Sequence, residues 1–440
     1  MKALLDNWHV WMVLAGLAIG HSAAAPQPRP VMNDFIGING HTVQFKPELY
    51  RPIGRLARDY HPVEWDLARE TDKPAPFPFA KNRVDWNHVY GAWKEQGWSI
   101  DVSLMFETIP LGNWSHLEQD AQAYGAAFAR EFGPSGKRKL VESAEIGNEP
   151  GKWSDADYTR MFRAMATGLR AGDPKIKIAS CNLTVGPSDD YTKSVQCLKD
   201  IPSLVDILTI HSYAQLTGWP TWKRSYPEDP ALPKYLKEIQ DLCAWRDAHM
   251  PGKPVWITEF GYDSTTQPPE KSGDFAKWEG VTDRQQAQWI VRSLLLFSAM
   301  PVERAYIYFF NDDDKPSLHA SSGLTRHFTP KPSFYAVAHL RQTLGDFRFT
   351  RIVADEPGKR RIHEYQHAKN PTHVVWAVWS PTCGKEGQSQ RLPRVPGKLV
   401  SSTIMPLTEA PTTAGSAKQI APGVVEMTVT ETPEYLLLAL

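Results

Sequence analysis

Eight short apolar runs, separated by helix-like segments, constrain the fold of this 440-residue chain most strongly. Repeated alternation of this kind is the pattern of βα units, whose strands form a parallel sheet. The expected strands lie near Phe35–Asn39, Gly54–Arg58, Ile100–Met105, Ser143–Ile146, Lys177–Ser180, Asp206–His211, Val255–Thr258 and Ala305–Phe309. Because eight strands with interleaved helices close a (β/α)8 barrel, the sequence predicts an α/β fold of the TIM-barrel type.

Helix signals between the expected strands support this interpretation. The four clearest segments are Leu117–Phe132, Asp155–Gly172, Leu232–His249 and Asp283–Ala299. The second of them begins after Ser154, a residue suited to an N-cap, and closes at a glycine.

The pattern changes near Leu344–Gly345, where helical periodicity stops. Strand-like runs punctuated by Pro and Gly follow, at Arg361–Gln366, His373–Ser380, Lys398–Ile404, Val424–Thr430 and Tyr435–Leu440. We therefore expect a catalytic barrel over residues 31–342 and an all-β sandwich as an accessory domain over 345–440.

The N-terminus carries a targeting pattern. Lys2 precedes an apolar stretch from Trp8 to Gly20, and small residues follow up to Ala25. This is the form of a secretory signal peptide over residues 1–25, and the apolar stretch is too short for a comfortable membrane span. We expect a secreted or periplasmic protein without stable membrane insertion; if the segment is not cleaved, it would anchor the protein to a membrane.

Charge and cysteine usage exclude some classes of function. Lys plus Arg and Asp plus Glu number 49 each, so no strong field indicates nucleic acid as a partner. The four cysteines show no spacing typical of a zinc site, and no cofactor or metal is expected. Cys181 and Cys197 are the favoured disulfide pair, with buried thiols as the alternative. Nothing in the sequence indicates an oligomeric state.

Two glutamates carry the chemical signal. Glu149 and Glu259 each follow an expected strand, and the carboxyl ends of parallel barrel strands meet at one face. A pair of carboxyl groups, one to protonate the leaving oxygen and one to attack or to activate water, is what cleavage of a glycosidic bond requires. Asn148, directly before Glu149, is placed to hydrogen-bond a sugar hydroxyl.

With these motifs, residues 33–342 resemble a retaining glycoside hydrolase of the (β/α)8 clan that includes families 5 and 39, and most resemble family 39-like bacterial polysaccharide hydrolases. The resemblance implies that Glu149 is the acid/base and Glu259 the nucleophile. It also implies that His211 and Tyr213 lie near the nucleophile. Arg58 matches the arginine that keeps the nucleophile ionised, with Arg55 as its competitor.

The aromatic residues depart from that pattern in one place. Many members of the clan have a Trp at the end of the eighth strand as the floor of a sugar subsite, whereas this chain has Tyr306–Phe310 there. Phe309 or Phe310 is expected to provide the aromatic platform instead. Trp219 and Trp222, in the loop after the sixth strand, are expected to stack on sugars rather than to pack in the core.

The sequence therefore predicts an enzyme that acts on a polysaccharide or oligosaccharide, and we favour endo-acting hydrolysis by double displacement. An exo-acting β-xylosidase-type enzyme and a catalytically inactive carbohydrate-binding barrel are the alternatives. Glu107 and His41 are further candidates for subsite residues, Glu145 has no assigned role, and Asn311–Asp314 is expected to be a solvated loop or to contact substrate rather than to bind calcium.

Overall fold

The computed structural model describes residues 28–41, 44–67, 84–382, 387–409 and 413–440. The predicted signal peptide therefore lies outside the described residues. Within them, no helix is long and apolar enough to cross a membrane.

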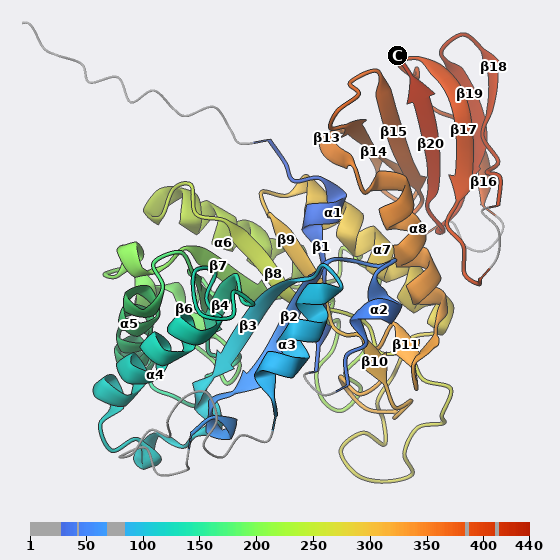
Figure 1. Cartoon of the computed structure of the whole chain (residues 1–440). Helices are drawn as coiled ribbons and strands as arrows, with labels where there is room; N and C mark the ends of the chain where they lie inside the picture. Colours follow the sequence, from blue (N-terminus) through green and yellow to red (C-terminus); the bar gives the residue numbers. More distant parts are fainter. Residues whose placement is uncertain (1–27, 42–43, 68–83, 383–386, 410–412) are drawn as a thin grey trace, which may run out of the picture.

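Eight parallel strands close into a barrel, which confirms the predicted fold class. Its strands, in chain order, are β1 (Ile36–Gly40), β2 (Leu56–Pro62), β3 (Ser99–Met105), β4 (Ser143–Ile146), β5 (Lys177–Thr184), β7 (Ile207–His211), β8 (Val255–Phe260) and β9 (Arg304–Ile307). Pairing of β1 with β9 and of β4 with β5 completes the ring, and the short β6 (Lys193–Ser194) pairs with the end of β5. Strands four, six and seven of the barrel, which carry or precede Glu149, His211 and Glu259, are thus β4, β7 and β8 (Figure 1).

The second strand differs most from expectation. We expected it over Gly54–Arg58, but it begins at Leu56 and continues to Pro62. Its second half is polar, yet Asp59 and His61 are buried, and His61 bonds to Asp66 at 2.6 Å. Because these polar side chains have buried partners, the strand continues where hydrophobicity alone predicts its end.

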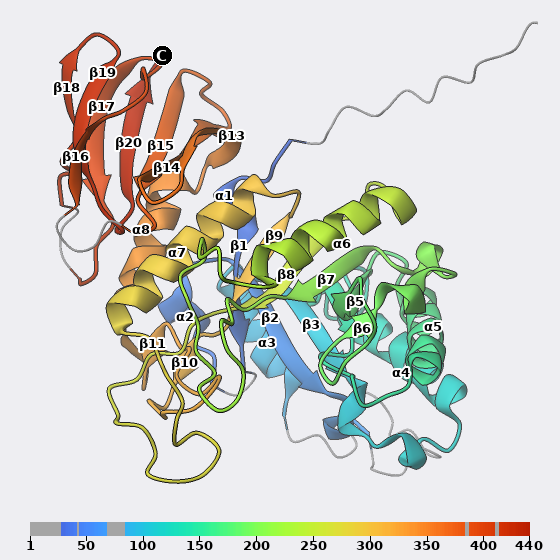
Figure 2. The same cartoon turned by 180° about the vertical axis from the view of Figure 1, so that it is seen from behind.

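Helices surround the barrel as expected (Figure 2). They are α1 (Met32–Phe35), α2 (Pro47–Tyr50), α3 (Trp86–Glu95), α4 (Leu117–Phe132), α5 (Asp155–Gly172), α6 (Tyr235–His249), α7 (Asp283–Ala299) and α8 (Pro332–Leu344). Ser154 caps α5 by accepting from the amide of Asp157, and Thr282 with Gln285 forms a capping box on α7. Helices α4 and α5 approach closely because a Cβ on Gly125 would lie 2.5 Å from the carbonyl oxygen of Met165.

A two-sheet antiparallel domain follows the barrel. One sheet contains β13 (Phe347–Glu356), β14 (Arg360–His367), β15 (His373–Trp379), β20 (Glu434–Ala439) and β17 (Lys398–Ile404), and the other contains β16 (Gln388–Arg391), β19 (Val424–Val429) and β18 (Lys418–Ala421). Strand β13 was not expected from the sequence. It is a charged, half-exposed edge strand with two register shifts, so it lacks the apolar alternation that marks a strand.

The sandwich packs on α7 and α8, away from the loops that follow β2 and β9 (Figures 1 and 2). Tyr365 and Ser298 share a hydrogen bond of 2.9 Å, and the ring of His363 lies 3.2 Å from the carbonyl oxygen of Leu295. Trp379 donates to Glu228, which also accepts from Arg292 of α7. Helix α7 is therefore buried on both sides, between barrel and sandwich.

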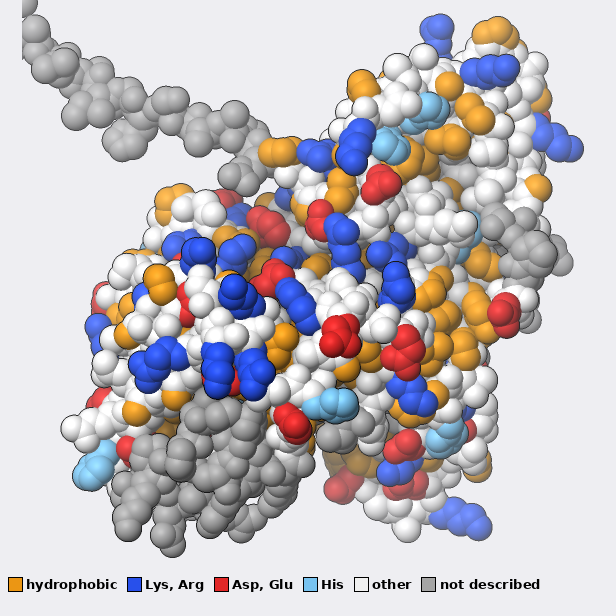
Figure 3. All heavy atoms as spheres, in the orientation of Figure 1, with side chains coloured by type: hydrophobic (Ala, Val, Ile, Leu, Met, Phe, Trp, Pro, Cys, Tyr) orange, Lys and Arg blue, Asp and Glu red, His pale blue; other side chains and the backbone are white. Residues whose placement is uncertain are grey.

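The predicted Cys181–Cys197 disulfide is wrong for this structure, in which both residues are buried free thiols. The Cys181 sulfur lies 3.6 Å from the carbonyl oxygen of Asn182, and its backbone amide contacts the hydroxyl of Tyr158. Packing of this strand against α5 satisfies Cys181 without a bridge. Cys243 is also a free buried thiol, and Cys383 lies outside the described residues. Positive and negative side chains are interspersed on the outer face shown in Figure 3, in keeping with their equal numbers.

Candidate active site

The two glutamates meet at the carboxyl ends of the barrel strands. Glu149 lies just beyond β4, and Glu259 lies near the end of β8. A carboxylate oxygen of each lies within 4.8 Å of the other and of a ring nitrogen of His211, the last residue of β7. The chain thus brings together three side chains separated by up to 110 positions in sequence, as the barrel topology requires.

Glu259 is held by three donors in a nearly closed environment. Its Oε1 accepts from Arg58 at 3.0 Å and from the hydroxyl of Tyr60 at 2.6 Å, and its Oε2 accepts from the hydroxyl of Tyr213 at 2.8 Å. Burial by itself would raise the pKa of Glu259, but nearby His211, Arg58 and the two hydroxyls lower it to about 2. Glu259 is therefore ionised at any ordinary pH, as a nucleophilic carboxylate must be.

Arg58 is fully buried at the floor of the site. Besides Glu259, its guanidinium donates to Glu145 at 2.7 Å, to Asn148 at 2.8 Å and to Asn39 at 2.9 Å. The competing Arg55 is half exposed and pairs with Asp34. The structure thus places Arg58, and not Arg55, against the predicted nucleophile.

Glu149 has a different environment, because about a third of its side chain remains exposed. One of its oxygens lies 2.8 Å from Nδ1 of His211, and the same nitrogen lies 3.6 Å from Glu259. A carboxyl group that reaches solvent and one neighbouring imidazole is able to exchange a proton with a leaving group or with water. The two glutamates are therefore chemically unequal.

The turn that delivers Asn148 and Glu149 depends on two neighbours. Gly147 has φ +88°, a conformation open to glycine, and a Cβ there would lie 2.8 Å from the ring of Phe106. The backbone amide of Asn148 donates to the carboxylate of Glu107 at 2.9 Å. Burial, together with the charge of Glu149, raises the pKa of Glu107 to about 7 against the backbone bonds that lower it. Glu107 thus stabilises the turn by accepting a hydrogen bond from the backbone amide of Asn148.

The aromatic residues after β9 take separate positions. Phe310 is buried against Phe45 and Tyr50, so it packs in the core and is not the expected platform. Phe309 is 8% exposed and lines a pocket of about 510 Å³. Tyr308, which we did not single out, lines the same pocket and packs edge-on to Tyr60.

This pocket adjoins Glu259, because Tyr60, which donates to Glu259, is part of the pocket wall. Its other lining residues include His41, Trp65 and Lys315. Burial lowers the pKa of His41, whose ring stacks on Tyr60 at 5.1 Å, although the charge of Glu259 opposes this. Aromatic walls beside a few polar groups are typical of sugar-binding pockets.

The two tryptophans of the loop after β7 do not line this pocket. Trp219 is 70% exposed, and Trp222 is partly buried with φ +50°. Neither has a contact with Glu149 or Glu259 among the described interactions, so sugar stacking at these positions stays a prediction.

The structure shows contributors that the sequence reasoning missed. Tyr60 is two residues beyond Arg58 on β2, and alternate strand residues share a face, so this spacing could have indicated it. His319 packs edge-on to Tyr213 at 4.8 Å, and the guanidinium of Arg224 lies 4.4 Å from the Tyr213 ring. His319 comes from a distant loop, for which the sequence offers no comparable signal.

The acidic run at Asn311–Asp314 is not simply a solvated loop. Asp312 pairs with Lys331 at 3.1 Å, and Asp314 accepts from Thr265 and from the backbone of Thr266. Asp313 is exposed. Asp314 thus ties the β9–α8 connection to the loop after β8, which leaves little of the open oxygen cluster that calcium needs. Asp312 and Asp313 line the same pocket as Tyr60, so contact with substrate at these residues stays a prediction.

Within the described part of the chain, the one cluster with metal-ligand spacing is Glu149, His211 and Glu259. The cation of Arg58 already contacts Glu259, and each of its carboxylate oxygens accepts from a phenol. The geometry therefore suits chemistry on a neutral substrate better than a resident divalent cation.

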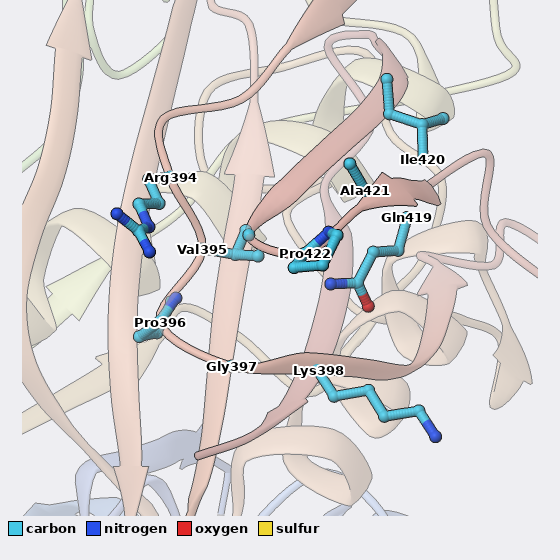
Figure 4. A pocket seen from close by; sticks show the side chains of 10 residues that line it. Arg394, Val395, Pro396, Gly397, Lys398, Gln419, Ile420, Ala421 and Pro422 are labelled. Carbon is cyan, nitrogen blue, oxygen red and sulfur yellow. The ribbon is translucent and has the colours of Figure 1, made fainter.

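A second cavity lies in the sandwich, formed by the chain before β17 and by the β18–β19 hairpin (Figure 4). It measures about 710 Å³, and its charged lining residues are Arg394 and Lys398. It contains no carboxyl group, so it lacks the means to cleave a glycosidic bond.

Known proteins share this architecture. Residues 83–294 match the model of the cellulase family, glycosyl hydrolase family 5. A family 39 glycoside hydrolase from the gut symbiont Bacteroides cellulosilyticus WH2 is similar in structure, with a TM-score of 0.67 and 18% identity over 92% of this chain and 80% of that one.

Two further solved structures extend the comparison. A glucosidase from Croceicoccus marinus has a TM-score of 0.64 and 13% identity over 94% of this chain and 97% of that one. A family 30 subfamily 8 xylanase from Clostridium acetobutylicum has a TM-score of 0.59 and 12% identity over the same shares. No curated protein sequence matches the chain. The family model over residues 83–294 and the shared fold together indicate a (β/α)8 glycoside hydrolase of the clan that includes families 5 and 39.

Proposed function

We propose that the protein is a secreted, retaining β-glycoside hydrolase that cleaves within polysaccharide chains, with Glu259 as nucleophile and Glu149 as acid/base. The separation of the two carboxyl groups carries this proposal. Oxygens within 4.8 Å of each other fit a retaining enzyme, whose carboxyl groups lie about 5–5.5 Å apart, and not an inverting enzyme at about 6.5–9.5 Å.

The proposed reaction has two steps. Ionised Glu259 attacks the anomeric carbon while Glu149 donates a proton to the departing glycosidic oxygen, which leaves a glycosyl ester on Glu259. Glu149, now a carboxylate, then takes a proton from water, and the resulting hydroxide displaces Glu259 and restores both groups.

Neighbouring side chains support each role. Arg58, Tyr60 and Tyr213 keep Glu259 charged and fixed before attack. His211 lies between the two carboxyl groups and orients Glu149 through its Nδ1. Asn148 is held at its Oδ1 by Arg58, so its amide nitrogen is directed away from that contact and is available to a sugar hydroxyl.

The pocket beside Tyr60 favours endo-acting hydrolysis. It extends from the nucleophile side of the site and offers Trp65 and Phe309 as surfaces for sugars beyond the one under attack. An exo-acting β-xylosidase-type enzyme needs room for one sugar there. A non-catalytic binding protein needs neither the paired carboxyl groups nor the donors that lower the pKa of Glu259.

Hydrolysis of a polysaccharide panel with sizing of the products tests the proposal. Early release of oligosaccharides of mixed length supports endo action, and release of single sugars supports the exo alternative. Glu259→Ala and Glu149→Gln should each remove nearly all activity. Near wild-type activity in Glu259→Ala would contradict the proposed mechanism. Binding without product release would favour the non-catalytic alternative. Secretion is tested separately, by sequencing the mature N-terminus for cleavage after Ala25.

A further inference from the structure

A second pair of carboxyl groups lies beneath the catalytic pair, at the floor of the barrel. Asp101 on β3 and Glu145 on β4 are both fully buried. Asp101 stands opposite Arg58 in the β2–β3 ladder and opposite Ser143 in the β3–β4 ladder, and Glu145 is two residues beyond Ser143. Residues two apart on a strand share a face, so all of these side chains point to the same interior.

One oxygen of each carboxyl group has a clear partner. Asp101 Oδ1 accepts from the hydroxyl of Ser143 at 2.5 Å, and Glu145 Oε2 accepts from Nε and Nη2 of Arg58 at 3.0 and 2.7 Å. The other oxygens, Asp101 Oδ2 and Glu145 Oε1, are buried and have no donor among the residues that the structure describes. The two groups are diagonal neighbours across the β3–β4 ladder, on the same face of the sheet, and each acts electrostatically on the other.

Two ionised carboxylates cannot hydrogen-bond, because each offers only acceptors. A proton between them supplies the missing donor and leaves one negative charge on the pair instead of two. We propose that Asp101 and Glu145 share one proton and together carry one negative charge. This pair positions Arg58 so that its guanidinium donates hydrogen bonds both to Glu145 and to the nucleophile Glu259. The expected effect on kinetics rests on the proposed role of Glu259 as nucleophile. The shared proton does not depend on that role.

The local charges support a singly charged pair. Arg58 contacts both Glu145 and Glu259, and Arg304 lies close enough to Asp101 to act on it electrostatically. With one shared proton, Arg58 faces two negative charges instead of three, one on Glu259 and one on the pair. Burial raises the pKa of both carboxyl groups, to about 7 for Glu145, while Arg58 opposes the rise.

The pair has a consequence for the reaction. Glu145 accepts two of the hydrogen bonds of Arg58, so only Nη1 of the guanidinium reaches Glu259. If Glu145 loses its charge, Arg58 interacts more strongly with Glu259, and the nucleophile becomes a weaker base. Asp101 does not contact Arg58 among the described hydrogen bonds, and its part is to hold the proton.

Infrared spectroscopy of the substrate-free protein tests the shared proton directly. The wild type should show the C=O band of a buried protonated carboxyl group that shifts in D2O, and Asp101→Asn should lose it. Glu107→Gln serves as control, since Glu107 is the other buried carboxyl group near the site with a pKa of about 7 and should contribute a separate band. An unchanged spectrum in Asp101→Asn overturns the proposal, whether or not the protein hydrolyses glycans.

Kinetics tests the positioning role. Asp101→Asn should keep kcat/KM within about twofold, because an amide can donate to Glu145 in place of the proton. Glu145→Gln should lower kcat/KM by about tenfold, which corresponds to about one pK unit in the nucleophile. A purely structural role would lower the Tm of both variants and leave their kcat/KM alike. Equal kcat/KM in the two variants, both measured while folded, contradicts the proposal.

Discussion

Removal of the hydroxyl of Tyr60 should raise the pKa of Glu259, the proposed nucleophile. This hydroxyl lies 2.6 Å from Glu259 in a buried site, and it stabilises only the ionised form of the carboxyl group. A hydrogen bond to a charged group contributes about 1.5–3 kcal/mol, which corresponds to roughly one to two pK units. In Tyr60→Phe, the pKa of Glu259 should therefore rise from about 2 to roughly 3–4.

A carbon-13 NMR titration of glutamate-labelled, substrate-free protein measures this pKa. The Glu259 resonance is assigned from its absence in Glu259→Gln. Tyr124→Phe is a matched control, because the hydroxyl of Tyr124 also donates to a buried carboxylate, Asp66 at 2.8 Å, but outside the site. A Glu259 pKa that stays near 2 in Tyr60→Phe, or that rises equally in Tyr124→Phe, would refute the electrostatic account of the nucleophile.

Three further predictions follow from single side chains. Arg58→Lys should lower kcat/KM by about a hundredfold or more. One ammonium group cannot replace a planar guanidinium that donates hydrogen bonds to Glu259, Glu145 and Asn148 at once. Steady-state kinetics of the folded variant measures this loss. His363 lies between the sandwich and α7, and burial lowers its pKa from 6.5 to about 4. The neutral ring therefore contributes about 3 kcal/mol to the free energy of unfolding above pH 6.5, and this contribution is lost as the pH falls to about 4. Denaturant unfolding of His363→Gln should show a flatter pH dependence over this range than that of the wild type. Gly125→Ala should destabilise the protein by about 1–3 kcal/mol, since the added methyl group meets the backbone of α5, whereas Gly91→Ala on α3, where nothing lies within 4 Å, should be neutral or stabilising in thermal unfolding.

The sequence was sufficient for the barrel because the signal is repeated eight times. A boundary error in one strand, such as the start of β2, does not change the number of βα units or the closure of the sheet. The sequence was less sufficient for the sandwich. Strand β13 is charged and half exposed, and it is a strand because it pairs with β14, not because it has an alternating hydrophobic pattern.

The sequence predicted those residues of the candidate site that lie at the ends of barrel strands. Glu149, Glu259, His211 and Arg58 all lie on or directly beyond barrel strands, so the fold alone brings them together. The sequence left Phe309 and Phe310 as alternatives, because it does not say which of two neighbouring aromatic residues faces the core. The shared environment of Asp101 and Glu145 also depends on strand register, which only the structure supplies.

Covalent trapping of the intermediate tests the central assignment most directly. A 2-fluoro glycoside with a good leaving group, matched to the sugar that the panel identifies, slows hydrolysis of the glycosyl ester so that it accumulates. Mass spectrometry of the digested protein should find the sugar attached to Glu259, in a peptide that is unlabelled in Glu259→Gln. Labelling of Glu149 instead, or turnover of the reagent with no ester on Glu259, would contradict the account.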